Sequence, residues 1–134
     1  MLTHHLPSAA VTILALIVYF VLGANVARAR GRYRIAAPAV DGDPAFARIY
    51  RVQQNTLEQL VPFLPALWLF ALTVGDPWAG LIGLVWPIGR IVYAWGYYRD
   101  AEKRGPGFVL TVAPTVVLLI GALIGIVRTA LAGP

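Results

Sequence analysis

Three polar side chains recur at helical spacing in an otherwise apolar stretch: Arg51, Asn55 and Glu58. At 100° per residue, Asn55 lies about 40° from Arg51 around a helix and Glu58 about 20° on the other side, so the three share one stripe. They offer a guanidinium that can fork onto a carboxylate, an amide, and a carboxylate that can accept from an ammonium or hold the arginine. Ionisable groups at the mouth of a membrane helix are costly unless they are paired or used. This stripe is therefore the first candidate for a site.

A second stripe follows about forty residues later. Relative to Arg90, Tyr93 falls about 60° away, Tyr97 about 20° and Arg104 about 40°, all on the same side, if one helix continues to Gly105. Arg90 is the deepest of the four, and two interpretations of it remain open. It either forms an ion pair with Glu58 or Asp100, or it takes part in function.

Composition predicts that membrane helices position these stripes. Of 134 residues, 59% are hydrophobic and 13% are charged, against about 45–50% and 25% in soluble domains. Crossing about 30 Å of hydrocarbon takes roughly 20 helical residues, and four segments are long enough. Asp43 suits an N-cap, with Pro44 in the first turn of the second helix. We therefore predict an all-α integral membrane protein, with one four-helix domain over residues 1–134 and helices at roughly 8–27, 45–74, 78–104 and 108–131.

The distribution of charge predicts the orientation of the bundle. Lysine and arginine gather in the first and third connections, whereas the N-terminus and the second turn carry none and the C-terminal end has only Arg128. The positive-inside rule then places both termini outside and the two basic loops in the cytoplasm. For Arg28, Arg32 and Arg34, contact with anionic lipid headgroups is the plain interpretation. Nucleic acid is not an expected partner, because no soluble module carries the basic surface.

Metal chemistry is not expected from this sequence. It has no cysteine, which excludes disulfides and cysteine ligands. His4 and His5 are adjacent, so they point apart on a helix, and no further ligand is near them in the sequence. We expect no metal cofactor.

Several motifs resemble one known family. The segment 44–58, with its core Arg-x-x-Arg-x-Gln-x-Asn-x-x-Glu at 48–58, the segment 89–97 and the segment 103–108 look like the membrane-associated proteins of eicosanoid and glutathione metabolism, the MAPEG family. The likeness extends over nearly the whole chain. It is greatest to the branch with the microsomal glutathione transferases of the second type and leukotriene-C synthase.

The resemblance implies a membrane-bound glutathione transferase or peroxidase that acts on hydrophobic electrophiles or lipid hydroperoxides. It also implies a homotrimer, with glutathione as co-substrate between neighbouring subunits near the cytoplasmic face. Arg104 matches the family residue that activates the thiol. Matching positions place the glutathione-binding residues in two groups: Arg51, Asn55, Glu58, Tyr93 and Tyr97 beside Arg104, and Arg30 and Gln53 from the adjacent chain.

Two departures from the family pattern bear on specificity. Gly31 stands where leukotriene-C synthase has a second consecutive arginine, and Gln59 where close relatives have tyrosine or phenylalanine. Both favour a less selective transferase or peroxidase. Two alternatives are a noncatalytic lipid-binding scaffold of the same family and a small four-helix multidrug exporter. The exporter family places its membrane glutamate in the first helix, where this chain has no acid.

Overall fold

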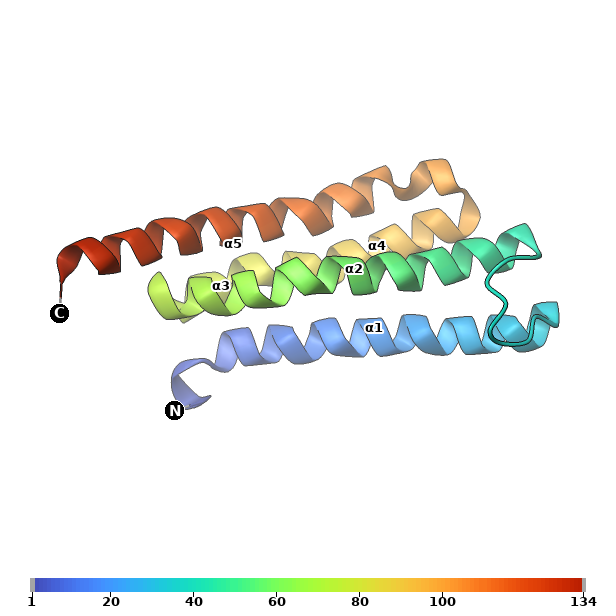
Figure 1. Cartoon of the computed structure of the whole chain (residues 1–134), viewed down its shortest axis with the longest axis horizontal. Coiled ribbons are helices and arrows are strands. Elements are labelled where there is room, and N and C mark those ends of the chain that lie inside the picture. Colours follow the sequence, from blue (N-terminus) through green and yellow to red (C-terminus); the bar gives the residue numbers. More distant parts are fainter. Residues whose placement is uncertain (1, 134) are drawn as a thin grey trace.

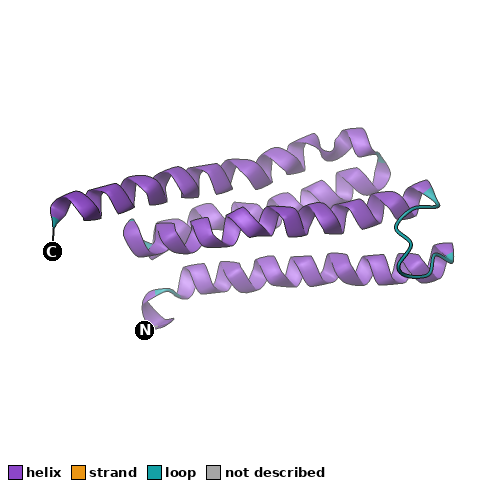
Figure 2. Cartoon of the chain, in the orientation of Figure 1, coloured by secondary structure: helices purple, strands orange, loops and turns teal. Residues whose placement is uncertain are grey.

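Four long helical segments run side by side along one axis (Figures 1 and 2). The computed structural model describes residues 2–133. The helices are α1 (Leu6–Tyr33), α2 (Pro44–Thr73), α3 (Asp76–Gly83), α4 (Val85–Arg99) and α5 (Gly105–Ala132), with 3₁₀ turns η1 (Leu2–His4) and η2 (Ala101–Arg104). No strand occurs among the described residues. The prediction of an all-α membrane bundle is confirmed.

Each of the four segments is long and apolar enough to cross a membrane. The spans are Leu6–Tyr33, Pro44–Thr73, Asp76–Arg99, which joins α3 and α4, and Ala101–Ala132, which joins η2 and α5. Large apolar side chains such as Phe20, Leu72 and Ile91 are exposed along the bundle. Hydrocarbon can cover these side chains in a bilayer without the cost that water would impose.

The first connection begins and ends at identifiable caps. At the end of α1, Arg34 takes a left-handed conformation with φ 55°, and its N–H bonds to the carbonyl of Arg30. At the start of α2, the Asp43 carboxylate accepts from the N–H of Ala45 at 2.8 Å, and Pro44 occupies the first turn. The predicted cap at Asp43 is confirmed, and such a cap satisfies one of the N–H groups that a helix start leaves free.

The predicted third helix at 78–104 is wrong in two respects. The span is divided at Leu84 into α3 and α4, and α4 ends at Arg99. Pro87 lies in the first turn of α4, where its missing N–H disrupts no helical bond, so the chain restarts a helix there. Asp100 is extended and accepts from the N–H of Glu102, which caps η2. The fourth helix begins at Gly105, three residues before the prediction.

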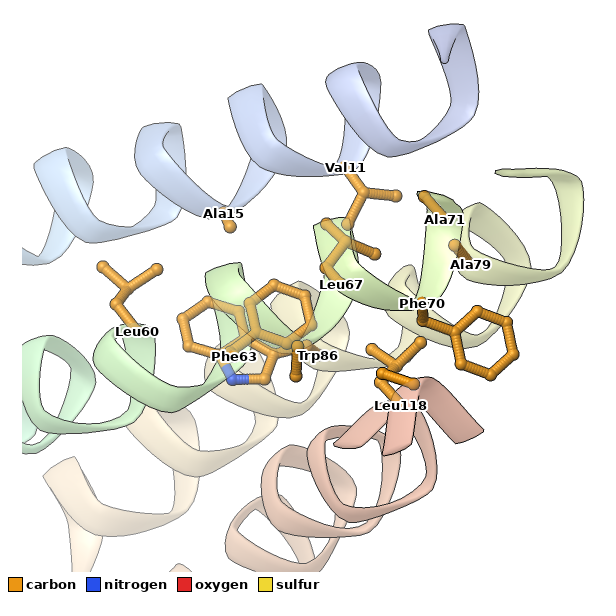
Figure 3. Packing of buried hydrophobic residues seen from close by; sticks show 12 residues of the cluster. Val11, Ala15, Leu60, Phe63, Leu67, Phe70, Ala71, Ala79, Trp86 and Leu118 are labelled. Atoms are coloured by element: carbon orange, nitrogen blue, oxygen red, sulfur yellow. The ribbon is translucent and has the colours of Figure 1, made fainter. Parts of the chain in front are cut away.

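The apolar core lies where α1, α2, α3, α4 and α5 meet (Figure 3). Phe63 of α2 and Trp86 of α4 stack with ring centroids 4.6 Å apart and planes 10° from parallel. Both rings are fully buried. A stacked aromatic pair contributes roughly 0.5–1.5 kcal/mol beyond its buried area, so this contact fixes the register of α4 against α2.

Both termini lie at one end of the bundle (Figure 1). The long α1–α2 connection and the turn η2 lie at the opposite end. The basic residues of these two connections therefore share one end, which we call the basic end.

Candidate functional site

The three polar residues of α2 contact one another near the basic end. Arg51 donates two hydrogen bonds to Glu58, from Nη1 to Oε1 at 3.1 Å and from Nη2 to Oε2 at 3.4 Å. The amide nitrogen of Asn55 donates to Oε2 of the same carboxylate at 3.2 Å. Seven residues of helix bring Arg51 and Glu58 almost onto one line, which is why the side chains meet. The predicted stripe is thus one hydrogen-bonded unit.

Asn55 connects this unit to α4. Its side-chain oxygen accepts from Nη2 of Arg90 at 3.0 Å. Asn55 and Arg90 are buried, whereas the side chains of Arg51 and Glu58 are each 52% exposed. The cluster therefore has a closed, buried side and an open side.

Arg90 is bound by hydroxyl groups instead of a carboxylate. Thr56 accepts from its Nε at 3.2 Å and from its Nη2 at 2.9 Å, and Thr111 of α5 accepts from Nη1 at 3.4 Å. Of the two interpretations left open for Arg90, the ion pair with Glu58 or Asp100 is not formed among the described residues. Glu58 is occupied by Arg51 and Asn55, and Asp100 lies beyond the end of α4.

The ring of Tyr93 adds an electrostatic contact to the buried guanidinium. The Cζ atom of Arg90 lies 4.0 Å from the ring centroid. A cation over an aromatic face gains about 2 kcal/mol or more when it is desolvated. Four hydrogen bonds to three oxygen atoms, together with one ring, thus hold Arg90 in a fixed position between α2, α4 and α5.

Tyr93, Tyr97 and Arg104 continue the cluster toward the basic end. The rings of Tyr93 and Tyr97 lie 5.5 Å apart, and Cζ of Arg104 lies 6.0 Å from the ring of Tyr97. Arg104 is exposed and donates from Nη1 to the carbonyl of Ala101 at 2.8 Å. Spacing predicted this proximity from one continuous helix, but the helix ends at Arg99, and the turn η2 places Arg104 over the ring of Tyr97.

Arg30 and Gln53 do not join this cluster within one chain. Arg30 donates to the carbonyls of Ala39 at 2.7 Å and Ile35 at 3.3 Å, and its Cζ lies 5.3 Å from the ring of Phe46. Gln53 donates to the hydroxyl of Tyr19 at 3.1 Å, on the side of α2 that faces α1. These two predicted site residues occupy separate positions.

Comparison with known proteins bears on the interpretation of this cluster. The MAPEG family profile matches residues 8–124. The chain belongs to the MAPEG family.

Individual relatives share this similarity along most of the chain. Human microsomal glutathione S-transferase 2 is 41% identical over 106 residues, which are 78% of this chain and 71% of that protein. Leukotriene C4 synthase of Cavia porcellus is 38% identical over 96 residues, 72% of this chain and 64% of that protein. An uncharacterised protein of Synechocystis is 51% identical over 118 residues, 88% of this chain and 86% of that protein.

Thr56 and Thr111 belong to the polar cluster of this MAPEG chain but were not predicted as members of it. In apolar helices threonine is an ordinary packing residue, and each of these two also donates to the carbonyl four residues earlier. Their spacing within α2 and α5 gives no sign that an arginine on α4 lies beside them. Within residues 2–133, no group of three or more His, Cys, Asp or Glu side chains is placed to hold a metal ion.

Proposed function

We propose that this MAPEG protein is a membrane-bound glutathione transferase with peroxidase capacity. It conjugates the glutathione thiolate to hydrophobic electrophiles or reduces lipid hydroperoxides. The observation that carries the proposal is the continuous row of contacts from the exposed Arg51–Glu58 pair, through Asn55, Arg90 and Tyr93, to Tyr97 and Arg104. Relatives named glutathione S-transferase support it.

The chemistry of the cluster fits glutathione group by group. Glutathione has two carboxylates, an ammonium and a thiol. Two of the donors of Arg51 are engaged by Glu58, and the guanidinium has five in all, so it can still fork onto a ligand carboxylate. Glu58 either accepts from the ammonium or orients Arg51 for that contact. Asn55, fixed from both sides by Arg90 and Glu58, provides a rigid amide.

Arg104 is the residue that we assign to thiol activation. A thiol with a pKa near 8.5 is only a few per cent thiolate at pH 7. Lowering that pKa by about two units takes roughly 2.7 kcal/mol of differential stabilisation, within reach of a guanidinium at hydrogen-bonding distance. The thiolate sulfur then bonds to the electrophilic carbon, and the displaced group leaves with the electron pair.

The ligand site is shared between subunits of a homotrimer in this proposal. Arg51, Asn55, Glu58, Tyr93, Tyr97 and Arg104 form one wall, and Arg30 and Gln53 of the adjacent chain form the other. Two features support this arrangement: the first wall is open on one side, and Gln53 faces away from it toward Tyr19. The basic end, and with it the site, lies on the cytoplasmic side according to the positive-inside rule.

A conjugation assay tests the function directly. Purified protein with glutathione and 1-chloro-2,4-dinitrobenzene is expected to form conjugate, and Arg104→Ala to lower turnover by one to three orders of magnitude, about 1.4–4 kcal/mol. Cumene hydroperoxide in place of 1-chloro-2,4-dinitrobenzene tests the peroxidase reaction. Folded protein that binds glutathione and forms no product with either substrate would favour the noncatalytic lipid-binding scaffold.

A further inference from the structure

A second feature of the bundle lies on the opposite face of α4 from Tyr93. A groove of about 420 Å³ lies between α1 and α4. Ile17 and Leu22 line it on the α1 side and Trp95 on the α4 side. Trp95 lies about 160° around the helix from Tyr93. The groove is therefore separate from the candidate glutathione site.

The groove changes character along its length. Its lining is apolar up to Asn25 and Tyr98, which it shares with an adjoining hollow of about 270 Å³. That hollow is lined by Arg28 and Arg32 at the basic end. One continuous depression thus runs from hydrocarbon-like walls to two guanidinium groups.

Hydrogen bonds organise the junction of the two parts. Arg28 donates to the side-chain oxygen of Asn25 at 3.0 Å, and the amide of Asn25 donates to the hydroxyl of Tyr98 at 3.2 Å. Among residues 2–133, no acceptor receives the hydroxyl proton of Tyr98, so it is available to a ligand. On the other wall, Arg99 lies over the ring of Trp95, with its Cζ 4.2 Å from the centroid. The polar end thus presents positive charge and donors, and no carboxylate lines either part.

The length of the apolar part matches one leaflet of a bilayer. Ile17 and Asn25 are eight residues apart on α1, a rise of about 12 Å. Half of a hydrocarbon core of about 30 Å is about 15 Å. An acyl chain whose headgroup lies at the basic end would therefore extend along the groove to near the middle of the membrane.

We propose that this groove binds an anionic phospholipid of the leaflet at the basic end. The phosphate lies between Arg28 and Arg32, the hydroxyl of Tyr98 donates to a phosphate or ester oxygen, and one acyl chain fills the apolar part. Basic pockets between membrane helices recognise anionic headgroups in this way. The proposal is independent of the glutathione site and stands or falls separately from it.

Quenching of Trp95 by brominated lipids tests the proposal. The full-length protein is placed in phosphatidylcholine bilayers that contain increasing fractions of acyl-brominated phosphatidylglycerol or, separately, acyl-brominated phosphatidylcholine. Subtraction of the Trp95→Phe signal isolates the residue in the groove. Half-maximal quenching is expected at a mole fraction about five-fold or more lower for phosphatidylglycerol than for phosphatidylcholine.

Two matched double variants distinguish binding at this groove from attraction of anionic lipid to the overall positive charge of the basic end. Arg28→Gln/Arg32→Gln is expected to abolish the preference for phosphatidylglycerol. Arg34→Asn/Lys103→Gln removes the same charge from exposed positions at the basic end that do not line the depression, and asparagine tolerates the left-handed conformation of residue 34. This control is expected to keep the preference. Tyr98→Phe, which keeps the ring, is expected to weaken it.

Three results would overturn the proposal. Equal quenching by the two lipids would show a groove without headgroup selectivity. An equal loss of preference in both double variants would assign it to the surface potential of the basic end. Trp95 that neither lipid quenches would show that a second copy of the chain covers the groove. The substituted side chains of both double variants are exposed, so their thermal unfolding temperature in detergent should match that of the wild type. This measurement excludes misfolding as the cause of a lost lipid preference.

Discussion

Asn55 joins the two halves of the candidate site. Its amide donates to Glu58 on the open side, and its oxygen accepts from Arg90 on the buried side. Neither an aspartate nor a leucine of similar size could make both contacts, since the first has no donor when ionised and the second has no polar atom. The orientation of Glu58 toward a ligand therefore depends on the buried network behind it.

Glu58→Gln tests whether this carboxylate serves the ligand or the fold. The change keeps the shape but removes the charge that binds an ammonium or orients Arg51, so the glutathione KM should rise much more than turnover at saturation falls. Stability should change little, because exposed ion pairs contribute about 0–1 kcal/mol. Steady-state kinetics measure the effect, with Glu102→Gln, an exposed acid on η2, as the control. A destabilised protein with normal glutathione affinity would instead assign the pair to structure.

Thr56→Val tests the hydroxyl cage of Arg90. Valine matches the shape of threonine but leaves Nε and one bond of Nη2 without an acceptor at a fully buried guanidinium, so unfolding should become easier by about 1–3 kcal/mol. Thermal unfolding in detergent measures this. Thr129→Val is the matched control, because that hydroxyl bonds only to the carbonyl of Gly125. Equal stability of the two variants would show that Arg90 does not need the cage.

At the scale of helices, close contact between α4 and α5 positions the network. A Cβ atom on Gly89 would lie 2.7 Å from the carbonyl carbon of Leu110 and 2.8 Å from its oxygen. Both are backbone atoms, so α5 would have to move. Gly89 precedes Arg90 directly, and Leu110 precedes Thr111, so the two helices approach at the point where the arginine meets its α5 partner.

Gly89→Ala should therefore separate α4 from α5. We expect a loss of about 1–3 kcal/mol in stability, as in other overpacked contacts, together with reduced activity because Arg90 and Asn55 shift. Gly23→Ala is the control: a Cβ there meets nothing within 4 Å, and alanine favours the helix by up to about 1 kcal/mol. Thermal unfolding and turnover of the two variants should diverge. A Gly89→Ala protein as stable and active as the control would contradict this packing.

The four membrane spans and the start of α2 could be predicted from the sequence, whereas the breaks within the third span and the contacts between helices could not. Apolar length indicated four spans, and Asp43 with Pro44 marked the start of α2, because these signals are local. The break at Leu84 and the turn η2 were not predicted. Hydropathy locates an apolar span, but it does not show the residue at which a helix restarts near Pro87 or ends before Asp100. The partners of Arg90 were missed because they lie 34 and 21 residues away on other helices. Spacing along one helix contains no information on such contacts.

At the scale of the whole molecule, the proposal requires more than one chain. Gln53 contacts Tyr19 on a different side of α2 from the Arg51 stripe, and Arg30 holds the first connection through Ala39 and Ile35. One subunit cannot turn both groups toward one ligand. The homotrimer in the proposal brings them together across an interface.

Mixed oligomers test this shared site. Gln53→Ala and Arg51→Ala subunits should each be nearly inactive alone. Random mixing in equal amounts yields three-quarters mixed trimers with one intact site in three, so about a quarter of wild-type activity should return. Differently tagged subunits verify the mixing, and mixed trimers isolated by tandem purification should have about a third of wild-type activity. Verified mixed oligomers without recovered activity would sink the shared-site proposal.

Titration with glutathione tests the central claim most directly. Detergent-solubilised protein is mixed with increasing glutathione at neutral pH while thiolate absorbance is recorded. We expect a saturable increase in thiolate absorbance in the wild type. The Lys103→Ala control should behave in the same way, because it removes an exposed charge next to Arg104 and leaves Arg104 in place. Arg104→Ala should bind glutathione and form little thiolate. An Arg104→Ala protein that forms as much thiolate as the wild type, or a folded wild type that forms none, would contradict the account.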